Sequence, residues 1–200
     1  MADAPTPAKV DGRVARAERT HAAIIEALVD VLAEGDLQPT AERIAERACV
    51  SLRTVYQHFP DRQALHKAVA ERQWREVGKV IEVIPSDAPL EERIERLVAQ
   101  RARIWGIVTP VRRVALLNAP FQPEIAQEMA HARAVIREGV ERLFARELDA
   151  LPARDRGEVL EALNVAAEWP TWETLRAHQG LGVDQAKAVV ARMLRALLRP

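Results

Sequence analysis

The segment 53–58 concentrates side chains that donate hydrogen bonds. They are Arg53, Thr54, Tyr56, Gln57 and His58. The surrounding stretch 47–60 contains no Asp or Glu, so these groups have no acidic partner close by in the sequence. Guanidinium, hydroxyl and amide groups of this kind bind the phosphates and base edges of DNA. The alternative is a helical hairpin with a merely solvated polar face, although such faces are usually mixtures of Glu and Lys.

Two short helices are predicted to position these side chains. Thr40 is a favourable N-cap for a helix over 41–48, and Ser51 is one for a helix over 52–59. Pro60 ends the second helix, because a residue that precedes proline is biased away from helical angles. Two helices separated by a short turn match the helix-turn-helix unit, whose second helix enters the major groove of DNA.

The composition of the whole chain predicts an all-α protein. Its 200 residues include only 8 Gly, strand-like alternation is nearly absent, and Ala, Leu, Glu and Arg dominate. Lys and Arg number 29, as do Asp and Glu, which argues against a general attraction to nucleic acid or membranes but permits a local basic face. A single Cys excludes an internal disulfide and suits a reducing cytoplasm. No apolar run approaches the roughly 18 residues that span a bilayer.

The helical periodicity of apolar residues predicts about nine helices. Their ranges are 14–34, 41–48, 52–59, 61–84, 90–108, 110–117, 124–151, 155–178 and 183–199. Pro170 is expected to kink the helix over 155–178. Residues 1–12 contain Pro5 and Pro7 but no apolar run, and are expected to form a disordered tail rather than a signal peptide.

Charged residues are distributed unevenly in the N-terminal part of the chain. The acidic residues that crowd the end of the first predicted helix are Glu26, Asp30, Glu34 and Asp36. No Lys or Arg occurs from position 22 to position 42. The positive charge of this part is therefore expected elsewhere, on Arg43, Arg47, Arg53 and Arg62.

The strings PTAERIA (39–45) and VSLRTVYQHFPDRQAL (50–65) resemble the DNA-binding signature of the TetR family of transcriptional regulators. The resemblance implies a helix-turn-helix domain over 13–60, joined by a connecting helix over 61–84 to a ligand-binding and dimerisation bundle over 85–200. It also implies that the protein binds double-stranded DNA. The implied DNA contacts are Thr40, Ser51, Leu52, Arg53, Thr54, Tyr56, Gln57, His58 and Arg62.

The resemblance also divides these contacts by role. The side chains implied to face the major groove are Leu52, Arg53, Thr54 and Gln57. Those implied to hold the DNA backbone are Thr40, Tyr56, His58 and Arg62. A basic arm made of Lys9, Arg13 and Arg16 would reach an adjacent phosphate or the minor groove, unless it is a solvated tail.

Cys49 is a departure from the family pattern. The family usually has Gly at this turn position, because the backbone there favours a positive φ. One hypothesis is a thiol redox switch inside the DNA-binding motif. The alternative, which we favour, is a small residue that the turn tolerates.

The predicted C-terminal bundle contains candidates for a ligand pocket with apolar walls and a few polar anchors. The walls would be Trp105, Val108, Leu116, Phe121, Met129, Trp169 and Trp172, and the anchors Arg112, Asn118 and His131. The alternative is that these are ordinary core aromatics and surface charges. Similar proteins pair their last two helices as an intersubunit four-helix bundle. The corresponding dimer candidates are Leu160, Leu163, Ala167, Val189, Val190, Met193 and Leu197, which would otherwise pack within one chain.

The expected function is that of a cytoplasmic, homodimeric repressor that binds a palindromic operator and is released by a small, largely apolar molecule. Alternatives are an activator, a regulator controlled by a protein partner, or a helical enzyme or carrier. The sequence has no HExxH motif, metal-ligand spacing of its His residues, Gly-rich phosphate loop or nucleophile elbow. We therefore expect neither enzymatic activity nor a metal or cofactor.

Overall fold

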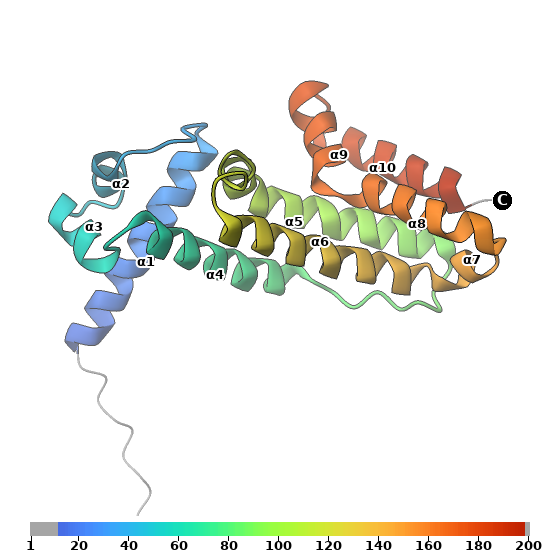
Figure 1. Ribbon diagram of the computed structural model, residues 1–200, viewed down its shortest axis with the longest axis horizontal. Coiled ribbons are helices and arrows are strands. Elements are labelled where there is room, and N and C mark those ends of the chain that lie inside the picture. The colour runs from blue at the N-terminus through green and yellow to red at the C-terminus, as the bar shows by residue number, and fades with distance from the viewer. Residues whose placement is uncertain (1–11, 199–200) are drawn as a thin grey trace, which may run out of the picture. The chain divides into compact units, whose positions relative to one another are not determined.

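The computed structural model of this chain describes residues 12–198 (Figure 1). Those residues form ten α-helices, one π-helix and no strand, which confirms the all-α prediction. The predicted tail and Lys9 of the predicted arm fall on residues 1–11 and lie outside the described residues, whereas Gly12 already belongs to α1. None of the described helices is long and apolar enough to cross a membrane. The chain divides into two compact units, 1–72 and 73–200.

The first unit is built on α1 (Gly12–Ala33), α2 (Ala41–Arg47), α3 (Leu52–His58) and the first part of α4 (Arg62–Val80). The amphipathic faces of these helices pack on one another, because each presents apolar residues at helical spacing. The larger buried apolar side chains include Ile24, Ile25, Leu28, Val31, Leu32, Ile44, Val55, Phe59, Leu65 and Val69.

Local backbone geometry fixes the end of α1. Gly35 has a φ of 97°. The N–H groups of Gly35 and Asp36 donate to the carbonyls of Leu32 and Val31, at 3.1 and 3.3 Å, and so close the end of α1. α4 begins at Arg62 and ends at Val80, earlier than the predicted end at residue 84.

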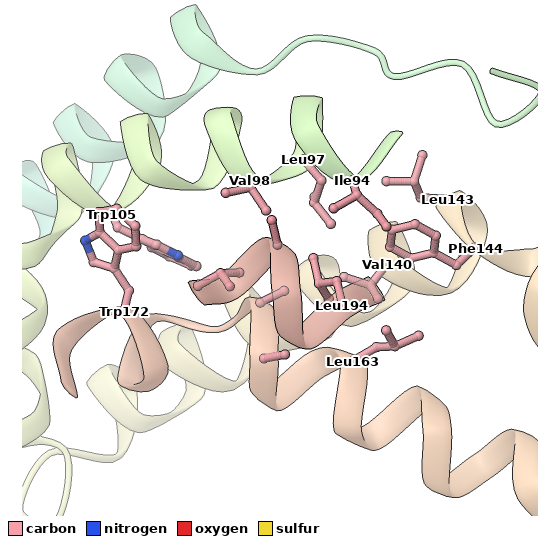
Figure 2. Close-up of a cluster of buried hydrophobic side chains, with 14 of the residues drawn as sticks. Ile94, Leu97, Val98, Trp105, Val140, Leu143, Phe144, Leu163, Trp172 and Leu194 are labelled. Carbon is pink, nitrogen blue, oxygen red and sulfur yellow. The ribbon is translucent and has the colours of Figure 1, made fainter. Parts of the chain in front are cut away.

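The second unit continues α4 and adds a bundle of longer helices. These are α5 (Leu90–Asn118), α6 (Pro123–Leu143), α7 (Ala145–Asp149), α8 (Ala153–Ala167), α9 (Trp169–Glu173), the π-helix η1 (Thr174–His178) and α10 (Val183–Leu198). α5, α6, α8 and α10 each contact two of the others, which closes the bundle (Figure 1). Figure 2 shows its core, where Ile94, Leu97 and Val98 of α5 meet Val140, Leu163 and Leu194.

The helix predicted over 124–151 is divided at Phe144. Phe144 has a φ of −112° and a ψ of 20°, which separates α6 from α7 and lets both Phe144 and Leu148 be fully buried. The break also frees the carbonyl of Leu143, which accepts a hydrogen bond of 2.6 Å from the buried guanidinium of Arg93. Periodicity alone did not reveal this break, because the apolar spacing continues across it.

Two prolines act differently from the sequence-based expectation. Pro110 does not start a new helix but lies inside a continuous α5. The hydroxyl of Thr109 donates to the carbonyl of Trp105 at 2.5 Å and accepts from the indole N–H of Trp169 at 2.9 Å, which anchors this part of α5. The helix predicted over 155–178 ends before its proline, because Glu168 is extended and Pro170 stands in the first turn of α9, where proline is tolerated.

Candidate functional site

Three side chains cap the helices of the first unit. The hydroxyl of Thr40 accepts from the N–H of Arg43 at 3.2 Å, and that of Ser51 accepts from the N–H of Thr54 at 3.1 Å. The carboxylate of Asp61 accepts from the N–H of Ala64 at 2.7 Å, at the start of α4. These bonds satisfy N–H groups that a helix cannot pair internally. They confirm the predicted starts of α2 and α3.

The turn between α2 and α3 depends on Cys49. Its φ of 54° is the only positive value among the non-glycine residues that the structure describes. The N–H of Cys49 donates to the carbonyl of Glu46 at 3.1 Å, and the N–H of Val50 donates to that of Ala45 at 3.0 Å. This is a Schellman motif, which normally has glycine at the position of Cys49. The thiol is exposed and free.

α3 has one buried and one exposed face. Val55 and Phe59 are 3% and 4% exposed and hold the helix against the rest of the unit. Arg53, Tyr56 and Gln57 are exposed, and with Leu52 they line a shallow open hollow. Three of the five polar residues singled out by the sequence therefore lie together on one surface.

Other residues of this segment that were predicted to contact DNA interact with side chains of the protein itself. His58 is half-buried, and its ring centroid lies 6.0 Å from that of His21 on α1. The hydroxyl oxygens of Ser51 and Thr54 lie 2.8 Å apart. The half-buried and capping residues of α3 thus orient the helix as well as border the exposed face.

Two of the arginines expected to supply the positive charge of the first unit are paired with a carboxylate. Arg43 forms an ion pair of 3.3 Å with Glu34, and Arg47 pairs with the same carboxylate. Although positions 22–42 contain no Lys or Arg, α2 returns beside the end of α1 and brings both arginines to Glu34. Within residues 12–198, neither Arg53 nor the exposed Arg62 forms an ion pair.

The predicted pocket residues of the second unit separate into two groups. Trp105, Trp169, Trp172 and Met129 are buried, and Figure 2 shows the rings of Trp105 and Trp172 together at one end of the core. Val108 is half-buried and packs against the same apolar cluster as the tryptophans.

Other predicted pocket residues lie on the surface or are already hydrogen-bonded. Phe121 is 82% exposed and Leu116 is also exposed, so neither lines an enclosed pocket of this chain. The amide of Asn118 donates to the carbonyl of Val114 at 2.8 Å and accepts from Gln122, so it serves the end of α5. His131 is exposed, with its ring 6.1 Å from that of Trp74.

Sequence reasoning missed one cation beside Trp105. The guanidinium carbon of Arg101 lies 5.8 Å from the centroid of the Trp105 ring. Burial lowers the pKa of Arg101 to about 10, although the carboxylate of Glu168 counteracts part of this effect. Burial also lowers the pKa of Arg112, with Arg133 acting in the same direction and Glu168 against it. Arg101 stands four residues before Trp105, one helical turn away, and that spacing was its only signal in the sequence.

The predicted dimer residues are also divided by burial. The residues buried within the chain itself are Leu160, Leu163, Ala167 and Val190. These four side chains pack within the chain, which is the alternative that the sequence left open, because α8 packs against α6 and α10, and α10 packs against α5 and α8. Met193 is 37% exposed, and Val189 and Leu197 are half-buried on the same stripe of α10. Val165 of α8, which the prediction omitted, is exposed as well.

Among residues 12–198, no group of three or more His, Cys, Asp or Glu side chains is arranged to hold a metal ion.

An exposed, capped recognition helix in a helix-turn-helix unit, followed by a larger helical bundle, defines a class of DNA-binding proteins.

Comparison with known proteins relates the N-terminal part of the chain to one family of this class. Residues 24–69 match the family described as "Bacterial regulatory proteins, tetR family". This confirms the resemblance in the sequence: over residues 24–69 the chain is similar to the N-terminal part of TetR-family regulators. No match was found among curated proteins.

Two solved structures share the fold of nearly the whole chain. A Mesorhizobium loti protein described as a TetR-family transcriptional regulator is 19% identical, with a TM-score of 0.58, and the match covers 92% of this chain and 96% of that one. A Clostridium perfringens protein described as a fatty acid metabolism regulator is 16% identical, with a TM-score of 0.53, and the match covers 86% and 97% of the two chains. At these identities the likeness concerns the fold alone.

Proposed function

We propose that this regulator is a repressor that binds a palindromic operator as a dimer and leaves it when a small molecule binds the second unit. The observation that carries the DNA-binding part is the division of α3 into two faces. Val55 and Phe59 anchor the helix, while Arg53, Tyr56 and Gln57 are exposed, and the sequence from 47 to 60 contains no Asp or Glu. A repressor of this kind acts in the cytoplasm, where its operator lies.

The exposed face of α3 suits readout of the major groove. Arg53 and Gln57 are one helical turn apart, so their side chains meet successive base pairs. Tyr56, Thr40 and Arg62 suit contacts with phosphates on either side, and fix the register of the helix on the duplex. Because Arg43 and Arg47 share Glu34, we assign the strongest phosphate contact to Arg62.

The proposed dimer interface is the apolar surface that remains on α8 and α10. Val189, Met193 and Leu197 follow one another at four-residue spacing on α10, and Val165 is exposed on α8, which packs against α10. A two-fold interface would present two α3 helices to half-sites roughly 34–36 Å apart, or a multiple of that spacing.

The proposed release acts through α4, which continues from Arg62 to Val80. Within the second unit, the amide of Gln73 donates to the carbonyl of Val108 at 3.3 Å, and the indole of Trp74 donates to Glu128 at 2.5 Å. A molecule that displaces α5 or α6 would therefore move α4. To release DNA it must bind the non-binding conformation more tightly, since equal affinity for both conformations shifts nothing.

The test is selection of DNA from the genome with the full chain, followed by gel-shift titration of the selected site and by transcription in vitro. We expect a palindromic sequence, lower transcription from a promoter that contains it, and a loss of affinity of about 5- to 150-fold for Arg53→Ala. Arg154→Ala is the matched control, because that side chain is 85% exposed in the second unit. Equal affinity for the selected and scrambled sites would contradict the proposal.

A further inference from the structure

Four of the six arginines of α5 form ion pairs with glutamates, and two do not. Arg93 pairs with Glu147, Arg96 with Glu92, Arg103 with Glu82 and Arg113 with Glu173. Within residues 12–198, Arg101 and Arg112 form no ion pair, and the Nε of each is buried without a hydrogen-bond partner. Removing a cation from water without a partner is unfavourable, so such a group calls for an anion.

The surroundings of these arginines have an excess of positive charge. Glu168, at the break between α8 and α9, is the carboxylate whose charge acts on both Arg101 and Arg112, yet it forms an ion pair with neither. Arg133 adds a third positive charge that acts on Arg112. Arg101 and Arg112 therefore share the charge of one carboxylate, Arg133 acts against it at Arg112, and a further negative charge would be held favourably.

Aromatic side chains lie next to this charge. Arg101 stands over the ring of Trp105, and Arg101, Trp105 and Arg112 share one face of α5, because their spacings of four and seven residues are helical repeats. Trp169 is held against α5 by its hydrogen bond to Thr109, and Trp172 lies beside Trp105 (Figure 2). Aromatic rings next to uncompensated cations suit a ligand with an apolar body and an anionic group.

We propose that the second unit binds a small organic anion with an apolar body, whose negative charge is held by Arg101 and Arg112 and whose body packs beside Trp105. This rests on the proposed function and refines it, because it replaces a largely apolar effector with an amphipathic anion. The charged group is a carboxylate or a chemically similar oxyanion, since guanidinium groups bind such groups through paired N–H donors.

The test compares pairs of probes that share an apolar body and differ in whether they carry an anionic group. The full chain is titrated with 8-anilinonaphthalene-1-sulfonate and with uncharged N-phenyl-1-naphthylamine, and separately with decanoate and 1-decanol, by tryptophan and probe fluorescence. We expect at least one anion to bind about 10- to 100-fold more tightly than its uncharged partner. Arg101→Met and Arg112→Met should each reduce that preference, whereas Arg154→Met, at an exposed site, should retain it.

Unfolding and DNA binding are measured on the same proteins. Because each Met variant removes an unpaired cation, its thermal midpoint without ligand should be equal to or above that of the wild type. Arg101→Gln and Arg112→Gln replace any Met variant that does not fold. Anions that bind no better than their uncharged partners, or variants that keep the full preference, would overturn the inference. Operator binding by the wild type is scored separately, so failure of the proposed function is distinguished from failure of the anion site.

Discussion

Arg93 on α5 and Glu147 on α7 form a bidentate ion pair, with Nη1–Oε2 and Nη2–Oε1 distances of 2.9 and 2.5 Å. Arg93 is 2% exposed, and its Nε and Nη1 also donate to the carbonyls of Ala88 and Leu143, respectively. The pair thus joins the start of α5 to the break between α6 and α7. A cation in this position is stable only while its partners are present.

Glu147→Gln should lower the free energy of unfolding by about 3–5 kcal/mol, because it leaves a buried guanidinium without its counter-charge. Urea denaturation measures this change. The control is Glu92→Gln, which breaks an exposed pair with Arg96 and should cost about 0–1 kcal/mol. Equal losses in the two variants would mean that Arg93 is as well solvated as Arg96.

The same pair predicts how stability depends on acid. Hydrogen bonding to Arg93 lowers the pKa of Glu147 below its usual 4.5. A carboxyl whose pKa is lower in the folded state contributes its full stabilisation above the unfolded-state pKa, and loses it as the pH falls through the folded-state pKa. Urea denaturation between about pH 3 and pH 7 should therefore show a loss of stability below about pH 4.5. Glu147→Gln should lack that part of the acid dependence, and an unchanged profile would assign it to other carboxyl groups.

Cys49→Gly should raise the free energy of unfolding by about 1 kcal/mol, because glycine adopts a φ of 54° without the steric cost that a side chain brings. Cys49→Ala is the control, since alanine keeps that cost and should leave stability nearly unchanged. Thermal or urea denaturation distinguishes the two variants. If wild type and Cys49→Ala bind operator equally before and after treatment with peroxide, the thiol is not a redox switch.

Arg62→Ala should weaken operator binding at every sequence and reduce the slope of log affinity against log salt by about 1, as expected for the loss of one phosphate contact. Arg43→Ala serves as a comparison, because Arg43 is paired with Glu34 and should contribute less. Fluorescence anisotropy at several salt concentrations measures both slopes. Wild-type affinity and slope in Arg62→Ala would remove this residue from the DNA-contact set.

Met193→Glu should convert the proposed dimer to monomers, because it places a charge in the exposed apolar stripe of α10. Light scattering coupled to size-exclusion chromatography gives the molecular mass. Ala188→Glu adds the same charge at an exposed position of α10 outside that stripe and should leave the mass unchanged. A dimer in both variants would place the interface elsewhere.

Local sequence signals predicted most of the first unit. Thr40 and Ser51 cap α2 and α3 because their hydroxyl groups need only a nearby backbone N–H. The turn at Cys49 and the two faces of α3 follow from short-range backbone geometry and helical periodicity. These features depend on residues a few positions apart, so the sequence by itself determined them.

Tertiary structure decided which side chains are paired and which faces are free. Glu34 meets Arg43 and Arg47, and Arg101 stays unpaired, because separate helices bring charges together or keep them apart in ways that spacing does not encode. Leu163 and Met193 both lie on apolar stripes, yet packing buries the first and leaves the second exposed. Burial depends on which helix covers a face, and that is a property of the whole bundle rather than of any segment.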